Sequence, residues 1–196
     1  MTDKVTEIYN AKEFFEFTKG KEERYELIDG EIYMMASPSV QHQDILNFIN
    51  IELSRYLKGK SCRVFIAPLD VVLFEKSDKD KKKKDNSQNV FQPDVFVVCN
   101  SKKIGINRIN GAPDFVVEVA SPSTSDNDYI YKLNAYMRYG VKEYWIADPE
   151  TKKIIVYTKT KKGVMPPAMY TFEDKIKVSI FEDFEINFKE LNFIED

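Results

Sequence analysis

Apolar and polar residues follow two spacings in the first third of the chain, one helical and one strand-like. Helices are expected at residues 11–17 and 41–57, where apolar residues recur on one helical face. Between them, Asp29 and Gly30 separate two apolar arms, the strongest short-range signal of a β-hairpin. Ser39 is the expected cap of the longer helix, since its hydroxyl can accept from amides at the helix start.

The rest of the chain alternates short apolar runs with one amphipathic segment. Strands are expected at residues 92–99 and 113–121, followed by a helix at 125–139. Residues 142–148 should form another strand, with 153–157 as its antiparallel partner. This order predicts an α/β (α+β) fold, in which a central mixed β-sheet is flanked by helices and an N-terminal helix and hairpin form an extension.

Composition and length indicate a globular protein. The chain has 196 residues, of which 43% are hydrophobic and 31% charged, and this suits one domain spanning residues 1–196. Residues 76–89 contain a run of lysines and no apolar residue, so a flexible Lys-rich surface loop is expected there. Its lysines could reach DNA phosphates, but the acidic residues among them favour a solvated tip.

The lack of a recognisable targeting signal and the spacing of the cysteines favour a cytoplasmic protein. No apolar run approaches the roughly 20 residues of a membrane helix, and the N-terminus lacks the pattern of a signal peptide. Cys62 and Cys99 lie in apolar runs, and neither has a second cysteine nearby with which to bind a metal. Both are therefore expected to be reduced, buried thiols. A net charge of -3 argues against a generally basic nucleic-acid coat, although local patches are not excluded.

Two carboxylates lie inside or at the start of apolar strands. Glu118 has apolar neighbours on both sides, and Asp94 directly precedes an apolar run. A buried carboxylate must be neutralised, paired or bound to metal, because an unpaired buried charge is costly. If the two strands are neighbours with matched faces, the carboxylates converge and suit a hard cation such as Mg²⁺ or Mn²⁺. The alternative is a solvated sheet face with Glu118 in water.

Short motifs occur in a fixed order between residues 10 and 160. They are the hairpin at 25–31, the helix start from Ser37 to His42, Pro93-Asp94, Glu118 with 119–124, Lys132, Tyr136, Gly140-Val141 and 143–149. This ordered set resembles the Uma2 family, a group of prokaryotic domains in the PD-(D/E)XK restriction-endonuclease-like superfamily. The resemblance implies a restriction-endonuclease-like fold.

The resemblance also implies a metal site and a catalytic lysine. Asp94 and Glu118 would bind Mg²⁺ or Mn²⁺, and the carbonyl of Val119 would complete the protein ligands. The superfamily usually has a lysine two residues after the second acid, where this chain has Ala120. The resemblance therefore places that lysine at Lys132, where it would orient or activate water. The alternative is an ordinary lysine on the surface of a helix.

Two further residues are candidates for secondary roles. His42 is the only histidine and could serve as a hydrogen-bond donor or proton carrier, although a histidine near a helix start is more often a capping or packing residue. Glu26 and Glu31 could complete an acidic pocket, and Glu26 ranks first because it lies within an apolar arm.

The resemblance, together with the candidate site residues, implies a metal-dependent endonuclease that hydrolyses phosphodiester bonds in DNA. The alternative is a catalytically weak or inactive nuclease-fold module that binds nucleic acid or protein in a mobile-element or defence system. DNA is the expected partner, a membrane is not, and a homodimer is left open. Retention of both acids and a candidate lysine favours the enzyme, whereas the acidic charge balance favours the binding module.

Overall fold

The computed structural model describes residues 7–75, 84–121 and 127–192. The helical elements are α1 (Ala11–Thr18), α2 (Val40–Leu57), η1 (Ser101–Lys103), η2 (Asn127–Lys132), α4 (Leu133–Tyr139) and η3 (Phe188–Glu190). The strands are β1 (Tyr25–Ile28), β2 (Glu31–Met34), β3 (Arg63–Ile66), β4 (Val71–Val72), β5 (Val90–Phe91), β6 (Val95–Val98), β7 (Ile109–Asn110), β8 (Phe115–Val119), β9 (Glu143–Asp148), β10 (Lys153–Thr160), β11 (Gly163–Val164), β12 (Ala168–Thr171), β13 (Lys175–Lys177) and β14 (Glu185–Asn187). No helix among these residues is long and apolar enough to cross a membrane.

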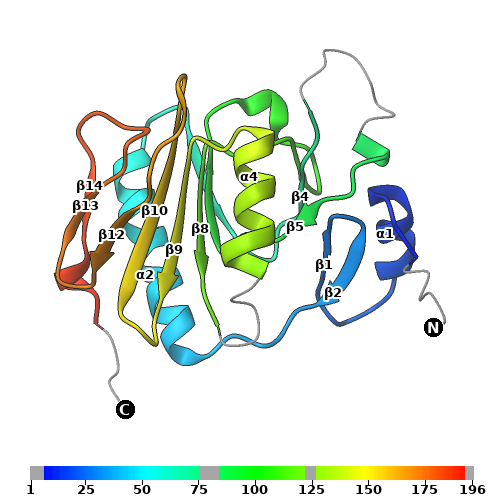
Figure 1. Ribbon diagram of the computed structural model, residues 1–196, viewed down its shortest axis with the longest axis horizontal. Coiled ribbons are helices and arrows are strands. Elements are labelled where there is room, and N and C mark those ends of the chain that lie inside the picture. Colours follow the sequence, from blue (N-terminus) through cyan, green and yellow to red (C-terminus); the bar gives the residue numbers. More distant parts are fainter. Residues whose placement is uncertain (1–6, 76–83, 122–126, 193–196) are drawn as a thin grey trace.

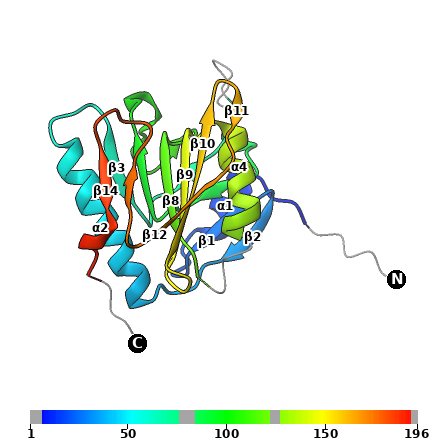
Figure 2. The same ribbon diagram turned by 60° about the vertical axis from the view of Figure 1, so that its left-hand side comes forward.

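The main sheet is mixed and lies between two helices. Its strands follow the order β11-β10-β9-β8-β6-β3, with β12 also paired to β10. Strands β8 and β9 are parallel, and η2 with α4 connects them, whereas β6 pairs with both β3 and β8 antiparallel. Helix α4 covers one face of this sheet and α2 the other (Figures 1 and 2). The predicted α+β fold with a helix-flanked mixed sheet is confirmed.

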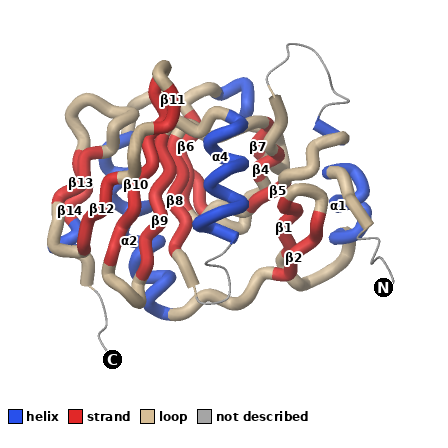
Figure 3. Tube along the Cα trace, in the orientation of Figure 1, coloured by secondary structure: helices blue, strands red, loops and turns tan. Residues whose placement is uncertain are grey.

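A smaller sheet extends the molecule beside α4. Its order is β2-β1-β5-β4-β7, and α1 lies at its outer side (Figure 3). Asp29 and Gly30 form the β1–β2 turn with φ angles of 48° and 89°, the left-handed values that the Asp-Gly pair predicts. The amide of His42 donates to Ser39 Oγ at 3.1 Å, so the predicted cap of α2 is also confirmed.

Strands β6 and β8 place the two candidate acids side by side at one end of the sheet. Val95 lies opposite Val117, so the next pair outward in the same register is Asp94 and Glu118. Val95 and Val117 pack in the core under α2, whereas Val116 packs in the core under α4. Because side chains alternate along a strand, Glu118 faces α4 with Val116. The strands that carry the two acids are thus neighbours, as convergence of the carboxylates requires.

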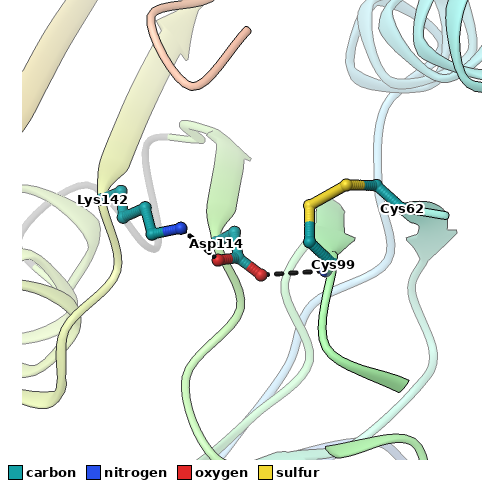
Figure 4. The surroundings of a disulfide bond; sticks show 4 residues. All are labelled: Cys62, Cys99, Asp114 and Lys142. Atoms are coloured by element: carbon teal, nitrogen blue, oxygen red, sulfur yellow. Dashed lines mark hydrogen bonds and ion pairs between the residues drawn. A yellow bond between two sulfur atoms is a disulfide. The ribbon is translucent and has the colours of Figure 1, made fainter. Parts of the chain in front are cut away.

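The prediction that both cysteines are reduced thiols is wrong, because Cys62 and Cys99 form a disulfide (Figure 4). They lie one residue beyond the paired ends of β3 and β6, where the antiparallel register brings them opposite each other. Asp114 Oδ2 accepts from the amide of Cys99 at 2.9 Å, and Asp114 Oδ1 lies 2.8 Å from Lys142 Nζ. The predicted cytoplasmic location stays a prediction, and a disulfide is uncommon in that compartment.

The predicted Lys-rich loop divides into two parts. Residues 76–83 lie outside the described residues. Ser87 and Asn89, near the end of the predicted loop, are buried against the small sheet. Ser87 Oγ donates to the carbonyl of Leu73, and Asn89 Nδ2 donates to Asp29 Oδ1 at 3.1 Å. The surface-loop interpretation therefore does not hold for these residues.

Glu143 is a fully buried acid that connects β9 to the C-terminal part of the chain. Its Oε1 accepts from the indole Nε1 of Trp145 at 2.7 Å, and its Oε2 accepts from the amide of Ile180 at 3.1 Å. Burial raises the pKa of Glu143 from 4.5 to about 7, although the hydrogen bonds from Trp145, Ile180 and Ser179 oppose the rise. The folded protein therefore holds this proton over a pH range in which the unfolded chain releases it.

We expect the stabilising contribution of Glu143 to decrease as pH rises. Its pKa is higher in the folded state, so its contribution is largest below pH 4.5 and is lost progressively until pH passes about 7. The shift corresponds to roughly 3 kcal/mol. Urea unfolding between pH 4.5 and 8 gives the free energy of unfolding of each protein. As pH rises, the wild type should lose stability relative to Glu143→Gln, which has no carboxyl group at this position. The exposed Glu182→Gln should track the wild type, and parallel wild-type and Glu143→Gln curves would contradict the assignment.

Candidate active site

Lys132 is the centre of a buried ionic cluster near the end of β8. The side chain is almost fully enclosed, since the residue is 3% exposed. Its Nζ lies 2.9 Å from Glu26 Oε2 and 3.2 Å from Glu118 Oε1. Glu26 and Glu118 are also buried, at 4% and 2% exposure. The cluster therefore joins β1 of the small sheet, β8 of the main sheet and the helix that follows β8.

The local helical geometry turns Lys132 inward. It is the last residue of η2, a π-helical segment, and α4 begins directly after it. Tyr131, which precedes Lys132, is 46% exposed, whereas Tyr136, one turn after Lys132, is fully buried. Lys132 and Tyr136 therefore share the helix face that packs on the sheet. The alternative of a surface lysine is wrong, as is the alternative that Glu118 points into water.

Tyr136 supplies a second donor to the same carboxylate. Its hydroxyl donates to Glu118 Oε1 at 2.7 Å. Burial, and then the negative charge of Glu118, raise the pKa of Tyr136 well above 10. The phenol consequently keeps its proton and remains a donor at neutral pH. Glu118 Oε1 is thus held by one ammonium and one hydroxyl, which fixes the orientation of the carboxylate.

Glu26 is fixed from the opposite side by the residue that precedes Pro93. Its Oε1 accepts from the amide of Gln92 at 2.7 Å. The Gln92 side chain accepts from Arg24 Nε at 3.0 Å and donates to Asp70 Oδ1 at 3.0 Å. Burial raises the pKa of Asp70, while the Gln92 hydrogen bond lowers it. Gln92 therefore links the ionic cluster to a polar network at the edge of the small sheet.

Asp94 is held by a different set of groups. Its Oδ2 accepts from the amide of Val119 at 2.8 Å and lies 3.2 Å from His42 Nε2 of α2. Asp94 is 7% exposed, and its Oδ1 makes no hydrogen bond or ion pair with a residue in the described parts of the chain. His42 thus contacts a predicted site acid as well as contributing its amide to the helix cap.

The two groups meet at the peptide between Glu118 and Val119. Glu118 contacts Lys132 on the α4 side, whereas Asp94 binds the Val119 amide and contacts α2 through His42. Within residues 7–75, 84–121 and 127–192, no three His, Cys, Asp or Glu side chains are grouped as a metal site. Carboxylate oxygens with a neighbouring backbone carbonyl are nevertheless the donor type that Mg²⁺ and Mn²⁺ prefer. The metal role of Asp94, Glu118 and Val119 stays a prediction.

The structure also separates the secondary candidates. Glu26 belongs to the ionic cluster, whereas Glu31 is exposed and accepts from the hydroxyl of Tyr33 at 2.9 Å. Gln92, Tyr136 and Arg24 were not among the site residues predicted from the sequence. Gln92 directly precedes Pro93-Asp94, and Tyr136 lies one helical turn after Lys132, so spacing alone offered a signal for both.

A family profile, two relatives and one solved structure are similar to this chain. A sequence profile of the family described as "Uma2: Putative restriction endonuclease" matches residues 11–189. Two relatives from Synechocystis sp., "Uncharacterized protein slr1290" and "Uncharacterized protein sll1609", are each 25% identical, over 170 and 162 residues. The matches cover 86% and 79% of this chain and 84% and 83% of the relatives.

A solved structure shares the fold. It is the crystal structure of "a putative nuclease belonging to DUF820" from Anabaena variabilis, with a TM-score of 0.66 and 19% sequence identity. The match covers 85% of this chain and 88% of that chain. The arrangement of sheets and helices described above is thus found in another protein with a different sequence.

Lys132→Met should destabilise the protein strongly, because it leaves two buried carboxylates without their cation. Removing one partner from a buried ion pair typically costs about 3–5 kcal/mol. Urea unfolding of the wild type and the variant at neutral pH measures this loss.

Lys142→Met is the matched control, since Lys142 pairs with Asp114 but its side chain is 61% exposed. An exposed pair contributes at most about 1 kcal/mol. The double variant Glu26→Gln/Lys132→Met should recover part of the stability lost in Lys132→Met, because one unpaired charge is gone. Equal losses for Lys132→Met and Lys142→Met would contradict a buried ionic cluster.

Proposed function

The chain belongs to the Uma2 family, and from this premise we propose that it is a metal-dependent endonuclease that hydrolyses phosphodiester bonds in DNA. The observation that carries the proposal is the buried cluster of Glu26, Glu118 and Lys132, one peptide away from the contact between Asp94 and Val119. Burying charges is costly, and titratable groups in such environments occur preferentially at functional sites.

Asp94 and Glu118 are the side chains proposed to hold Mg²⁺ or Mn²⁺, together with the carbonyl of Val119. The donor set fits a hard cation because it offers oxygen ligands, and Asp94 Oδ1 has no competing partner among the described residues. When bound, the metal would supply a Lewis acid that polarises the phosphate and lowers the pKa of water.

The chain's own residues would position the reactants around these acids. Tyr136 and Lys132 fix the Glu118 carboxylate from one side, and His42 with the Val119 amide fixes Asp94 from the other. Lys132 would orient the attacking water and stabilise negative charge that develops on the phosphoryl oxygens. The water oxygen forms a bond to phosphorus and releases a proton to solvent, the P–O ester bond breaks, and the leaving oxygen takes a proton from solvent.

One observation favours a second candidate, a nuclease-fold module that binds nucleic acid or protein without efficient cleavage. The net charge is -3, and the ammonium of Lys132 is already engaged by two carboxylates. A site with this charge balance attracts a polyanion weakly unless cations join it. A direct assay of cleavage separates the two candidates.

Plasmid and single-stranded DNA, each incubated with Mg²⁺, Mn²⁺ or EDTA, test the enzymatic proposal. We expect the wild type to cleave DNA with metal and not with EDTA. Glu118→Gln should lose activity by about a hundredfold or more, since the loss of one transition-state interaction has this effect. Initial rates from gel electrophoresis provide the measurement.

Glu31→Gln is the control for cleavage, because Glu31 is an exposed acid on the same hairpin as Glu26. It should cleave like the wild type. Binding of DNA by folded wild-type protein without cleavage under any metal condition would favour the binding module instead.

Metal binding should also raise thermal stability in the wild type. A ligand that binds only the folded state stabilises it by about 2.7 kcal/mol at a hundredfold excess over its Kd. Asp94→Asn should lose most of this response, whereas Asp183→Asn, an exposed aspartate that accepts from Tyr56, should keep it. Melting curves recorded against Mg²⁺ and Mn²⁺ concentration provide the test, and a wild-type Tm independent of metal would count against the site.

A further inference from the structure

We propose that Arg24 binds a phosphate group of the DNA backbone next to the bond that is cut. The inference rests on the proposed function and adds to it the residue that recognises the substrate's charge. Arg24 directly precedes β1, and the amide of Met35 donates to its carbonyl at 2.8 Å, which extends the β1–β2 ladder by one position. Its place in the fold is therefore set by backbone pairing.

Strand geometry puts Arg24 on the same side of the hairpin as the ionic cluster. Arg24 and Glu26 are two residues apart, so their side chains share a face and their Cα atoms are separated by about 7 Å. Glu26 on this face reaches Lys132. Gln92 connects the two directly, because its amide binds Glu26 Oε1 and its side chain binds Arg24 Nε. One glutamine thus separates the guanidinium from the cluster.

The partners of Arg24 leave its charge available. Nε donates to the neutral Gln92 amide at 3.0 Å, and Nη2 contacts the sulfur of Met35 at 3.5 Å. In the described part of the chain no carboxylate lies within ion-pair distance of this guanidinium, and its remaining N–H donors are without a hydrogen-bond partner. Arg24 is half-buried, is oriented by neutral acceptors and can present a planar fork to an anion.

The charge balance of the site explains why such a cation is needed. Glu26, Asp94 and Glu118 are buried together with one ammonium, that of Lys132. With the proposed divalent metal bound, the metal and the ammonium only balance the three carboxylates, so a further cation is needed to attract a phosphodiester. Phosphate is the anion whose oxygens match the guanidinium fork, and DNA presents phosphates in a regular series.

Salt-dependent DNA binding tests the inference on the full-length chain. Glu118→Gln serves as background to suppress cleavage, and fluorescein-labelled single-stranded and duplex oligonucleotides are titrated in Mg²⁺ between about 50 and 200 mM salt. Adding Arg24→Gln should weaken binding about tenfold at the lower salt. It should also reduce the slope of log Kd against log salt by about 0.7 for single strands and 0.9 for duplex. Arg24→Lys should keep the slope and lose part of the affinity, because it keeps the charge without the fork.

Arg55→Gln is the matched control, since Arg55 is an exposed arginine about 20 Å along α2 from His42. It should leave affinity and slope unchanged. If Arg24→Gln lowers the Tm but leaves the salt slope unchanged, Arg24 is only a structural support for Gln92 and the inference fails. If the wild type cleaves DNA and Arg24→Gln has the same KM and slope, the inference fails while the nuclease proposal stands. If the wild type neither cleaves nor binds DNA, both fail.

Discussion

The buried ammonium of Lys132 between Glu26 and Glu118 is the interaction on which the site depends. Each of the three groups would be costly to bury alone, and together they form two ion pairs of 2.9 and 3.2 Å. The three come from β1, from β8 and from the helix after β8. Their mutual attraction therefore requires the small sheet, the main sheet and the connecting helix to keep one relative arrangement.

The surrounding contacts make this arrangement specific. Tyr136 donates to Glu118, and the Gln92 amide donates to Glu26, so each carboxylate has a hydrogen-bond donor in addition to the ammonium. Asp94 lies beyond the same β8 peptide and is oriented by a backbone amide and His42. A site built this way has its acidic groups positioned before any ligand arrives, which reduces the reorganisation needed for binding or catalysis.

Much of the fold could be predicted from the sequence because local signals agreed with the final packing. Asp29-Gly30 specifies its turn through the left-handed backbone that both residues adopt. The apolar runs beside Asp94 and Glu118 predicted strands, and the structure places these two strands side by side. Residues 10–160 were also sufficient for the family resemblance, which the profile match confirms.

Other features depend on contacts between distant segments, and periodicity does not encode them. Lys132 lies at the border of an apolar stripe, so its burial is decided by the π-helical turn and by the two acids it meets. The disulfide between Cys62 and Cys99 follows from the register of β3 against β6, across 37 residues of sequence. Asn89 is likewise buried where its side chain donates to Asp29, which lies 60 residues earlier in the sequence.

The most direct measurement of the central claim is the position of a bound metal. Crystals of the protein soaked in Mn²⁺ and measured near the manganese absorption edge would locate the ion by its anomalous scattering. We predict one site, bound by Asp94 Oδ1, the Glu118 carboxylate and the Val119 carbonyl, with Lys132 nearby. Ordered density for these residues with no anomalous peak among them, or with Mn²⁺ bound elsewhere in the chain, would contradict it.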